Sequence, residues 1–177
     1  FRCEALSLWR KSLQNGLSYS YTWVLEDDMG YSGSLADLIM SYSEEAADLI
    51  SGPYLQDLGE NSDIIKHVGW DSSHICTDAF TQRATKKFMT DEVLQRFSHE
   101  LLDELDVWMH DGASAWSNQM SPSVCNTAGM AWQPLRQRDI GHAWAWNHRV
   151  SEDEWSRICK TAQNGLDHSR CFHALKF

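Results

Sequence analysis

The order of apolar and polar residues along the chain predicts helices and strands in alternation. Leu6, Trp9 and Leu13 recur at intervals of three and four residues, which predicts an amphipathic helix over residues 2–14. Residues 19–25 are rich in β-branched and aromatic types and therefore predict a strand. The nearly continuous apolar character of this strand is typical of a central strand that is covered on both faces.

Shorter elements are expected in the next part of the chain. Ser34 is suited to cap a helix over residues 35–45, because its hydroxyl can accept a bond from a backbone N–H of the first turn. Residues 47–51 and 63–70 are strand candidates, and residues 79–89 are ambiguous but could contain a strand.

The second half of the chain contains the longest regular pattern. Thr90 precedes residues 91–110, in which apolar residues repeat at three and four, and we expect one long helix there. Residues 113–149 are rich in tryptophan and lack a clear period, so we expect short elements at most. Ser151 and three acidic residues begin a further helix, and residues 171–177 have the character of an extended strand.

Strands that interleave with helices favour an α/β fold, which we expect to contain a mixed, mostly parallel sheet with helices on both faces. The 177 residues are enough for one domain with a sizeable core. The chain starts at Phe1 rather than at a methionine, and helix-like sequence follows at once. We therefore expect residues 1–177 to form a single, partial domain whose upstream part is missing.

Net charge limits the partners that the chain can have. The formal charge is −10, which argues against a nucleic-acid backbone or an anionic membrane surface as a partner. A phosphorylated ligand is compatible with this charge, because a divalent cation can bridge carboxylates and phosphates. No apolar run is long enough to span a bilayer. The five cysteines include no CxxC pair, which argues against a zinc ribbon and leaves buried thiols and one or two disulfides as alternatives.

Three consecutive carboxylates, Glu26, Asp27 and Asp28, follow the strand predicted at 19–25. In open α/β sheets, ligands bind at the carboxyl ends of strands. Alternation of side chains in an extended segment would put Glu26 and Asp28 on one side and Asp27 on the other. Two such charges repel by roughly 1–4 kcal/mol at effective dielectric constants of 80 down to 20, and a divalent metal would relieve that repulsion. A solvated acidic turn that precedes the next helix is the alternative.

The longer string from Trp23 to Gly33, W-x-x-E-D-D-x-x-Y-x-G, resembles glycosyltransferases of the GT-A type, in which an acidic DxD-like motif ends a central strand. Three downstream blocks extend the resemblance in matching order, at residues 94–105, 112–125 and 172–177. In that family the acidic motif binds a complex of a metal ion and a nucleotide sugar. The resemblance implies the C-terminal portion of a GT-A-like catalytic domain.

The resemblance also implies roles for individual residues. Asp28 and Asp27 would contact the metal and the diphosphate, and Glu26 would support them or face the nucleotide ribose. His173 matches a C-terminal histidine that completes the metal shell in some GT-A enzymes, and Lys176 would contact the leaving diphosphate. The implied cofactor is Mn²⁺ or Mg²⁺, and an imidazole ligand favours manganese. A histidine satisfied within a terminal strand and a surface lysine are the alternatives for His173 and Lys176.

The chain departs from the family pattern at one position, where Ser117-Asn118 stands in place of Ser-Glu. In an inverting transfer a carboxylate removes the proton of the acceptor hydroxyl, and an asparagine cannot do so. Asp71 and Asp111 are the candidate replacements for this catalytic position, with a solvated side chain as the alternative for Asp111. A retaining reaction or a catalytically impaired chain would also account for Asn118.

Histidines and tryptophans in the irregular region form a weaker candidate site. His142 and His148 are six residues apart, which matches neither helical nor strand spacing for metal ligands, so a structural role is expected for both. Alternatively, Trp144 and Trp146 line a sugar pocket.

The sequence therefore predicts a metal-dependent glycosyltransferase that moves a sugar from a nucleoside-diphosphate donor to a hydroxyl acceptor such as a glycan. A catalytically impaired module that binds nucleotide or glycan is the first alternative, and an interaction domain with an acidic turn is the second. No nucleic acid and no membrane contact by this chain are expected. The resemblance implies the lumen of the Golgi or the secretory pathway, with the cytoplasm as the alternative.

Overall fold

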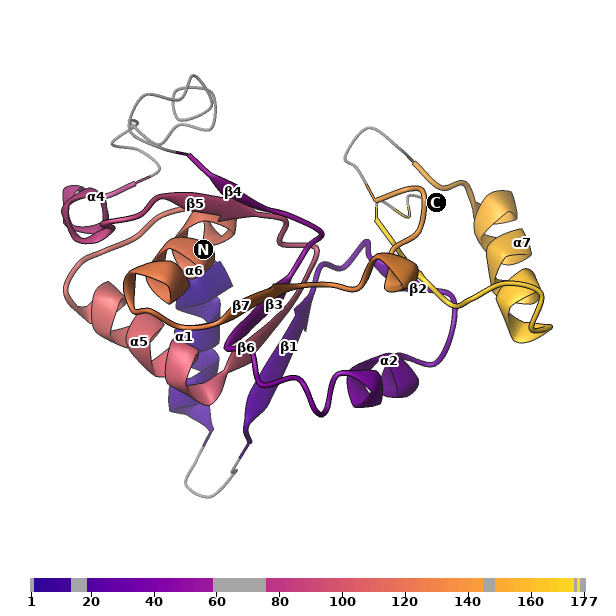
Figure 1. The fold of residues 1–177 in the computed structure, drawn as a ribbon, viewed down its shortest axis with the longest axis horizontal. Helices are drawn as coiled ribbons and strands as arrows, with labels where there is room; N and C mark the ends of the chain where they lie inside the picture. Colours follow the sequence, from indigo (N-terminus) through magenta and orange to yellow (C-terminus); the bar gives the residue numbers. More distant parts are fainter. Residues whose placement is uncertain (1, 14–18, 59–75, 145–148, 174, 176–177) are drawn as a thin grey trace. The chain divides into compact units, whose positions relative to one another are not determined.

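The computed structural model of the chain describes residues 2–13, 19–58, 76–144, 149–173 and 175 (Figure 1). The chain divides into two compact units. The first unit comprises Phe1–Val24 and Ala47–Pro134, and the second comprises Leu25–Ala46 and Leu135–Phe177. Six α-helices and a mixed sheet in the described residues make the fold mixed α/β, as the sequence predicts.

A four-stranded sheet in the order β1-β6-β3-β7 forms the centre of the first unit. Its strands are β1 (Tyr21–Leu25), β6 (Leu94–Ser98), β3 (Leu49–Ser51) and β7 (Trp132–Pro134). Strand β3 pairs antiparallel with β6, with Leu49 opposite Phe97, and parallel with β7, with Leu49 opposite Trp132. The expectation of a mostly parallel sheet is therefore corrected: the sheet mixes both orientations, because β3 and β6 run in opposite directions.

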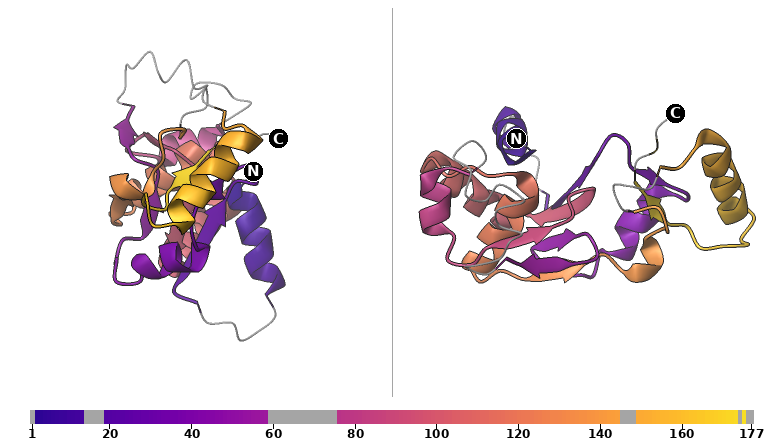
Figure 2. Two further views of the ribbon diagram at one scale, coloured as in Figure 1. Left: turned by 90° about the vertical axis from the view of Figure 1, so that its right-hand side faces the viewer. Right: turned by 90° about the horizontal axis from the view of Figure 1, so that it is seen from above.

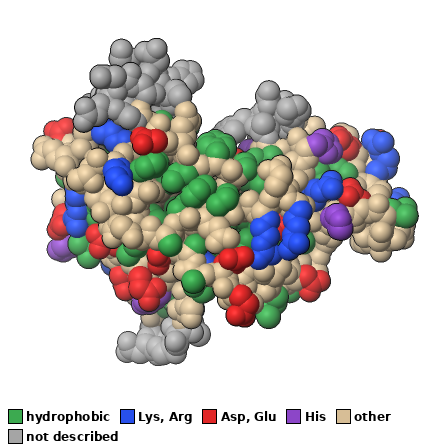
Figure 3. Space-filling model, in the orientation of Figure 1, with side chains coloured by type: hydrophobic (Ala, Val, Ile, Leu, Met, Phe, Trp, Pro, Cys, Tyr) green, Lys and Arg blue, Asp and Glu red, His purple; other side chains and the backbone are tan. Residues whose placement is uncertain are grey.

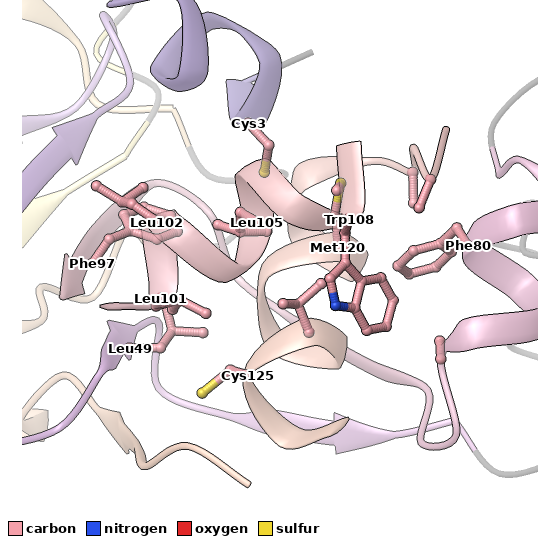
Figure 4. Packing of buried hydrophobic residues seen from close by; sticks show 14 of the residues in the cluster. Cys3, Leu49, Phe80, Phe97, Leu101, Leu102, Leu105, Trp108, Met120 and Cys125 are labelled. Carbon is pink, nitrogen blue, oxygen red and sulfur yellow. The ribbon is translucent and has the colours of Figure 1, made fainter. Parts of the chain in front are cut away.

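Helices α1 (Arg2–Ser12), α5 (His99–His110) and α6 (Ser117–Thr127) pack against one another, and α6 also contacts β3 and β7 (Figure 2). Figure 4 shows the core between these helices and the sheet. Leu49 and Phe97 point into it from paired positions of the sheet, and Leu101, Trp108 and Met120 meet them from α5 and α6. All five side chains are buried.

The remaining elements of the first unit lie beside this core. Helix α4 (Asp78–Arg83) contributes the buried Phe80. Strands β4 (Leu55–Asp57) and β5 (Phe88–Thr90) pair antiparallel, and α6 packs against β5. The ambiguous residues 79–89 thus contain the greater part of a helix and the start of a strand, whereas the strand predicted at 63–70 lies outside the described residues.

The long helix predicted at 91–110 is wrong in its first part. Residues Leu94–Ser98 form β6, and α5 begins only at His99. All five residues of β6 are buried, as in a central strand, and a run of buried residues can satisfy a helical period by coincidence. Ser98 then caps α5, because its Oγ accepts a hydrogen bond from the Leu101 N–H at 3.0 Å.

Helix α6 lies in residues 113–149, where the sequence predicts short elements at most. Its pattern is weak because several of its buried positions are polar, among them Ser117, Gln119, Ser121 and Ser123. Ser121 Oγ donates to the backbone oxygen of Ser117 at 2.6 Å, so the helix satisfies this buried hydroxyl itself. Because serine side chains occupy part of its buried face, the sequence of α6 shows little periodic recurrence of apolar residues.

The second unit contains two helices and two short strands that pair although they are far apart in the sequence. Helices α2 (Leu35–Ser41) and α7 (Glu152–Gln163) begin after the predicted caps, Ser34 and Ser151, although α2 is shorter than the expected range 35–45. Strands β2 (Gly30–Tyr31) and β8 (Cys171–Phe172) pair antiparallel, which confirms an extended segment within 171–177. A 3₁₀ turn, η1 (Gln137–Asp139), precedes α7.

Hydrogen bonds of the Tyr42 side chain link the end of α2 to η1 and the residue before it, within the second unit. Its buried hydroxyl donates to Asp139 Oδ2 and accepts from the backbone N–H of Arg136, both at 2.8 Å. The Arg136 guanidinium lies 4.3 Å from the centre of the Tyr42 ring and pairs with Glu45 at 2.7 Å. Burial is the main reason that the pKa of Tyr42 lies well above its usual value. Arg136 is thus engaged in contacts that hold α2 and η1 together.

No disulfide joins any of the five cysteines, all of which lie in the described part of the chain. Four of them are buried, and burial raises the pKa of Cys3, Cys125 and Cys171 to about 12. Of the two alternatives, the structure therefore has buried thiols.

Candidate metal centre

The turn that follows β1 separates the three acidic side chains. The Met29 N–H donates to the backbone oxygen of Glu26 at 3.2 Å, which closes a tight turn. Asp27 is exposed in this turn, whereas Glu26 and Asp28 are partly buried and turn toward the same neighbour. Glu26 and Asp28 thus share a side, as the sequence predicts, although the turn rather than an extended strand produces this arrangement.

That neighbour is His173, which follows β8. The pairing of β2 with β8 places Gly30 opposite Phe172, and the Leu175 N–H donates to the backbone oxygen of Asp28 at 2.9 Å. The His173 N–H donates to the backbone oxygen of Ala143 at 2.9 Å. Backbone bonds on both sides of the histidine therefore hold its ring beside the acidic turn.

Glycine at position 30 permits this close approach. A Cβ added to Gly30 would lie 2.2 Å from Leu175 Cδ1 and 2.9 Å from the Trp155 ring. A larger residue would have to displace the Leu175 side chain and the Trp155 ring.

The three side chains form a compact group of potential ligand atoms. His173 Nε2 lies 3.1 Å from Glu26 Oε2 and 3.5 Å from Asp28 Oδ1, and one ligand atom of each residue lies within 4.8 Å of the others. The His173 side chain is only 4% exposed, against 19% for Glu26 and 24% for Asp28. The group is therefore buried on the imidazole side and open on the carboxylate side.

The group offers ligand types that divalent metals take. A single N–H at Nε2 can donate to only one of the two carboxylates, whereas a dication attracts all three groups. Neighbouring octahedral ligands at about 2.1 Å from a metal are separated by about 3.0 Å, close to the two distances from Nε2. Two carboxylates with one imidazole favour Mn²⁺ over Mg²⁺, because imidazole suits the softer ion. Glu26, Asp28 and His173 therefore fit a manganese-type site.

The remaining candidate residues belong to the first unit or lie outside the described residues. Asn118 lies in α6 of the first unit, half-buried, with its Oδ1 lacking a hydrogen-bond partner among the described residues. Asp111 pairs with Arg83 at 2.7 Å, which accounts for an acidic residue after the end of α5. Asp71 and Lys176 lie outside the described residues.

Sequence reasoning gave Glu26 a supporting role and Asp27 a metal contact, whereas the geometry brings Glu26 and not Asp27 to His173. The signal that points to Glu26 is its spacing of two from Asp28. Beside this group, His142 Nε2 lies 3.2 Å from Glu154 Oε1, a partner that the sequence analysis did not consider.

Comparisons of the chain with protein-family models, with curated proteins and with solved structures give no match. No helix in the described residues is long and apolar enough to cross a membrane. What the chain does is therefore inferred from the chemistry of its own residues.

Proposed function

We propose that the protein is a metal-dependent glycosyltransferase of the GT-A type, which moves a sugar from a nucleoside-diphosphate donor to a hydroxyl acceptor. The observation that carries the proposal is the meeting of Glu26 and Asp28, at the end of β1, with His173, near the other end of the chain. The resemblance of the sequence to GT-A enzymes implies this combination of strand-end acid and C-terminal histidine. A mixed α/β fold with the acids at a strand end is compatible with it.

Each residue of the group has a distinct part in the proposal. Glu26 and Asp28 supply carboxylate oxygens on the open side, and His173 supplies an imidazole nitrogen from the buried side. A bound dication would offset the negative charge that develops on the diphosphate as it leaves the sugar. Asp27 is exposed to solvent and is not part of the group.

The acceptor side needs a group that takes a proton if the transfer inverts configuration. Asn118 lacks this ability, and Asp111 is held by Arg83 at 2.7 Å. Of the candidates from the sequence, Asp71 is therefore our proposed base. A retaining transfer would dispense with it.

Manganese titration followed by calorimetry tests the metal site directly. We expect Asp28→Asn and Glu26→Gln each to weaken Mn²⁺ binding by about a hundredfold, because each removes a charged ligand from a set of three. Asp27→Asn is the matched control, since it removes the same charge from the same turn outside the group. Equal Mn²⁺ affinity in the wild type and Asp28→Asn would refute the site.

Activity is then measured as release of nucleoside diphosphate from a panel of nucleotide sugars with Mn²⁺. We expect turnover by the wild type and by Asp27→Asn, and none by Asp28→Asn. Metal binding without turnover of any donor would contradict the transferase and leave the metal site standing.

A catalytically impaired module that binds nucleotide or glycan is the second candidate, and Asn118 is the observation that favours it. Metal-dependent nucleotide binding without product, even in Asn118→Glu, would support this reading over the first. We propose the Golgi or secretory lumen as the compartment on the resemblance alone; the absence of disulfides among the five cysteines adds no support to it.

A further inference from the structure

A cavity of about 240 Å³ opens beside α7 in the second unit. Four of its lining residues, Glu154, Arg157, Ile158 and Thr161, come from one face of α7, since residues three, four and seven apart lie on the same side of a helix. Figure 3 shows basic, acidic and histidine side chains gathered at the α7 end of this unit. Nothing in the proposed metal centre lines this cavity.

Arg157 places an exposed positive charge in the lining of the cavity. Its side chain is exposed, and no hydrogen bond or ion pair reaches its guanidinium from the described residues. The other arginine, Arg170, is held by Asp167 through two contacts of 3.0 and 3.2 Å. A guanidinium fork binds the paired oxygens of a carboxylate or phosphate. Arg157 is therefore the group that would receive an anionic ligand.

Hydrogen-bonding groups for an uncharged part of the ligand lie on the same wall. Glu154 Oε1 lies 3.2 Å from His142 Nε2, and both side chains line the cavity. A carboxylate has lone pairs for more than one donor, so Glu154 can also accept a hydroxyl. Such an acid would repel a simple anion but suits a molecule that combines an anionic group with hydroxyls.

The lining of the cavity also includes an apolar part, Phe172 and Ile158. Phe172 is buried, and its ring meets the rings of His142 and Trp155 edge to face at centroid distances of 5.6 and 5.8 Å. A Cβ on Gly141 would lie 2.3 Å from the Phe172 ring, so the backbone abuts it directly. Together with Ile158, this ring offers a rigid surface for the C–H face of a ligand.

We propose that this cavity binds a monosaccharide that carries one anionic group, a carboxylate or a phosphate. Arg157 binds the anionic group, Glu154 and His142 bind hydroxyls, and Ile158 and Phe172 pack against the sugar ring. The volume lies below the roughly 300–1,000 Å³ of sites for drug-sized ligands, which suits one sugar unit. The inference goes beyond the proposed transferase and does not depend on it.

Calorimetric titrations of the 177-residue chain, in the presence of EDTA, test the proposal with four probes: glucuronate, glucose 6-phosphate, glucose and inorganic phosphate. We expect one of the two charged sugars to bind about tenfold more tightly than glucose and than inorganic phosphate. A charged sugar contacts both Arg157 and the groups that bind hydroxyls, whereas glucose and phosphate each contact only one of these. Preference for glucuronate or for glucose 6-phosphate identifies the anionic group. Because EDTA removes divalent metal, failure of the metal site cannot produce failure here.

Arg157→Gln should abolish the preference for the charged sugar, and Arg157→Lys, which keeps the charge without the fork, should restore only part of it. Lys160→Gln is the matched control, because it removes one positive charge from α7 outside the lining of the cavity. Circular dichroism verifies that each variant is folded. Binding of glucose as tight as that of the charged sugars, unchanged binding by Arg157→Gln, or binding of no probe would overturn the proposal.

Discussion

Most of what the sequence predicts about the candidate metal centre comes from the chemistry of individual residues. Carboxylates at a strand end and a terminal histidine are chemically conspicuous, and the structure brings Glu26, Asp28 and His173 within reach of one ion. The spacing of two between Glu26 and Asp28 predicts that they share a side, but the sequence could not show that His173 lies on that side, because the turn closed by Met29 and the pairing of β2 with β8 bring it there. It also could not show that Asp111 is engaged by Arg83, because the two meet only through the fold.

Gly30 is the residue whose replacement should disturb the metal centre without touching a ligand. In Gly30→Ala the new methyl would meet the Leu175 side chain and the Trp155 ring, and moving them would loosen the packing next to His173. We expect Mn²⁺ affinity to fall by about tenfold, as when a ligand loses its positioning. Isothermal titration with Mn²⁺ measures the loss.

Gly112→Ala supplies the control for this substitution. Gly112 has φ of +83° and belongs to the first unit, so alanine there strains the backbone of a unit that does not contain the candidate metal centre. If both alanine variants weakened Mn²⁺ binding equally, the loss would reflect general destabilisation, and the positioning role of Gly30 would be wrong.

At the scale of elements, the hydrophobic pattern predicts helices that have one apolar and one polar face. It fails for elements that are buried on all sides and for helices whose buried residues are polar. Helix α7 has one exposed face and a capping serine, and its limits follow from the sequence. Strand β6 is buried throughout, and its apolar residues fit the helical period of the α5 sequence that follows. Helix α6 buries hydroxyl and amide side chains in place of apolar ones. Strand direction, such as β3 antiparallel to β6, is set by connections that the pattern does not encode.

Ser98 marks the change from strand to helix and should contribute more to stability than an ordinary cap. Its Oγ accepts from the Leu101 N–H and donates to Asp48 Oδ1 at 2.9 Å, in a buried position. We expect Ser98→Ala to lower the free energy of unfolding of α5 by about 2 kcal/mol, the upper end for a lost cap. Amide signals of α5 followed through a urea titration by NMR give this value.

The comparison is with Ser151→Ala, which removes the exposed cap of α7 and should cost that helix about 0.5–1 kcal/mol. A smaller loss for Ser98→Ala than for Ser151→Ala would contradict the view that burial and the bond to Asp48 strengthen the cap of α5.

At the scale of the whole molecule, the candidate metal centre belongs entirely to the second unit, although its residues come from distant parts of the chain. The backbone bond from Leu175 to Asp28 and the pairing of β2 with β8 join these parts without metal. A dication would add a bond between the same parts and would relieve the repulsion between Glu26 and Asp28. The stabilisation should therefore be local to this unit.

Hydrogen–deuterium exchange with and without Mn²⁺ tests this expectation. At free metal of 100 times Kd, an ion that binds only the native state stabilises it by about 2.7 kcal/mol, or about a hundredfold in protection where exchange requires opening of the site. We expect this gain in peptides containing β2 and β8, no comparable gain in α5 and α6, and none anywhere in Asp28→Asn. Protection in Asp28→Asn equal to that of the wild type would place the ion elsewhere. Equal protection of α5 would mean that both units open together, because the free energy of binding would then be shared between them.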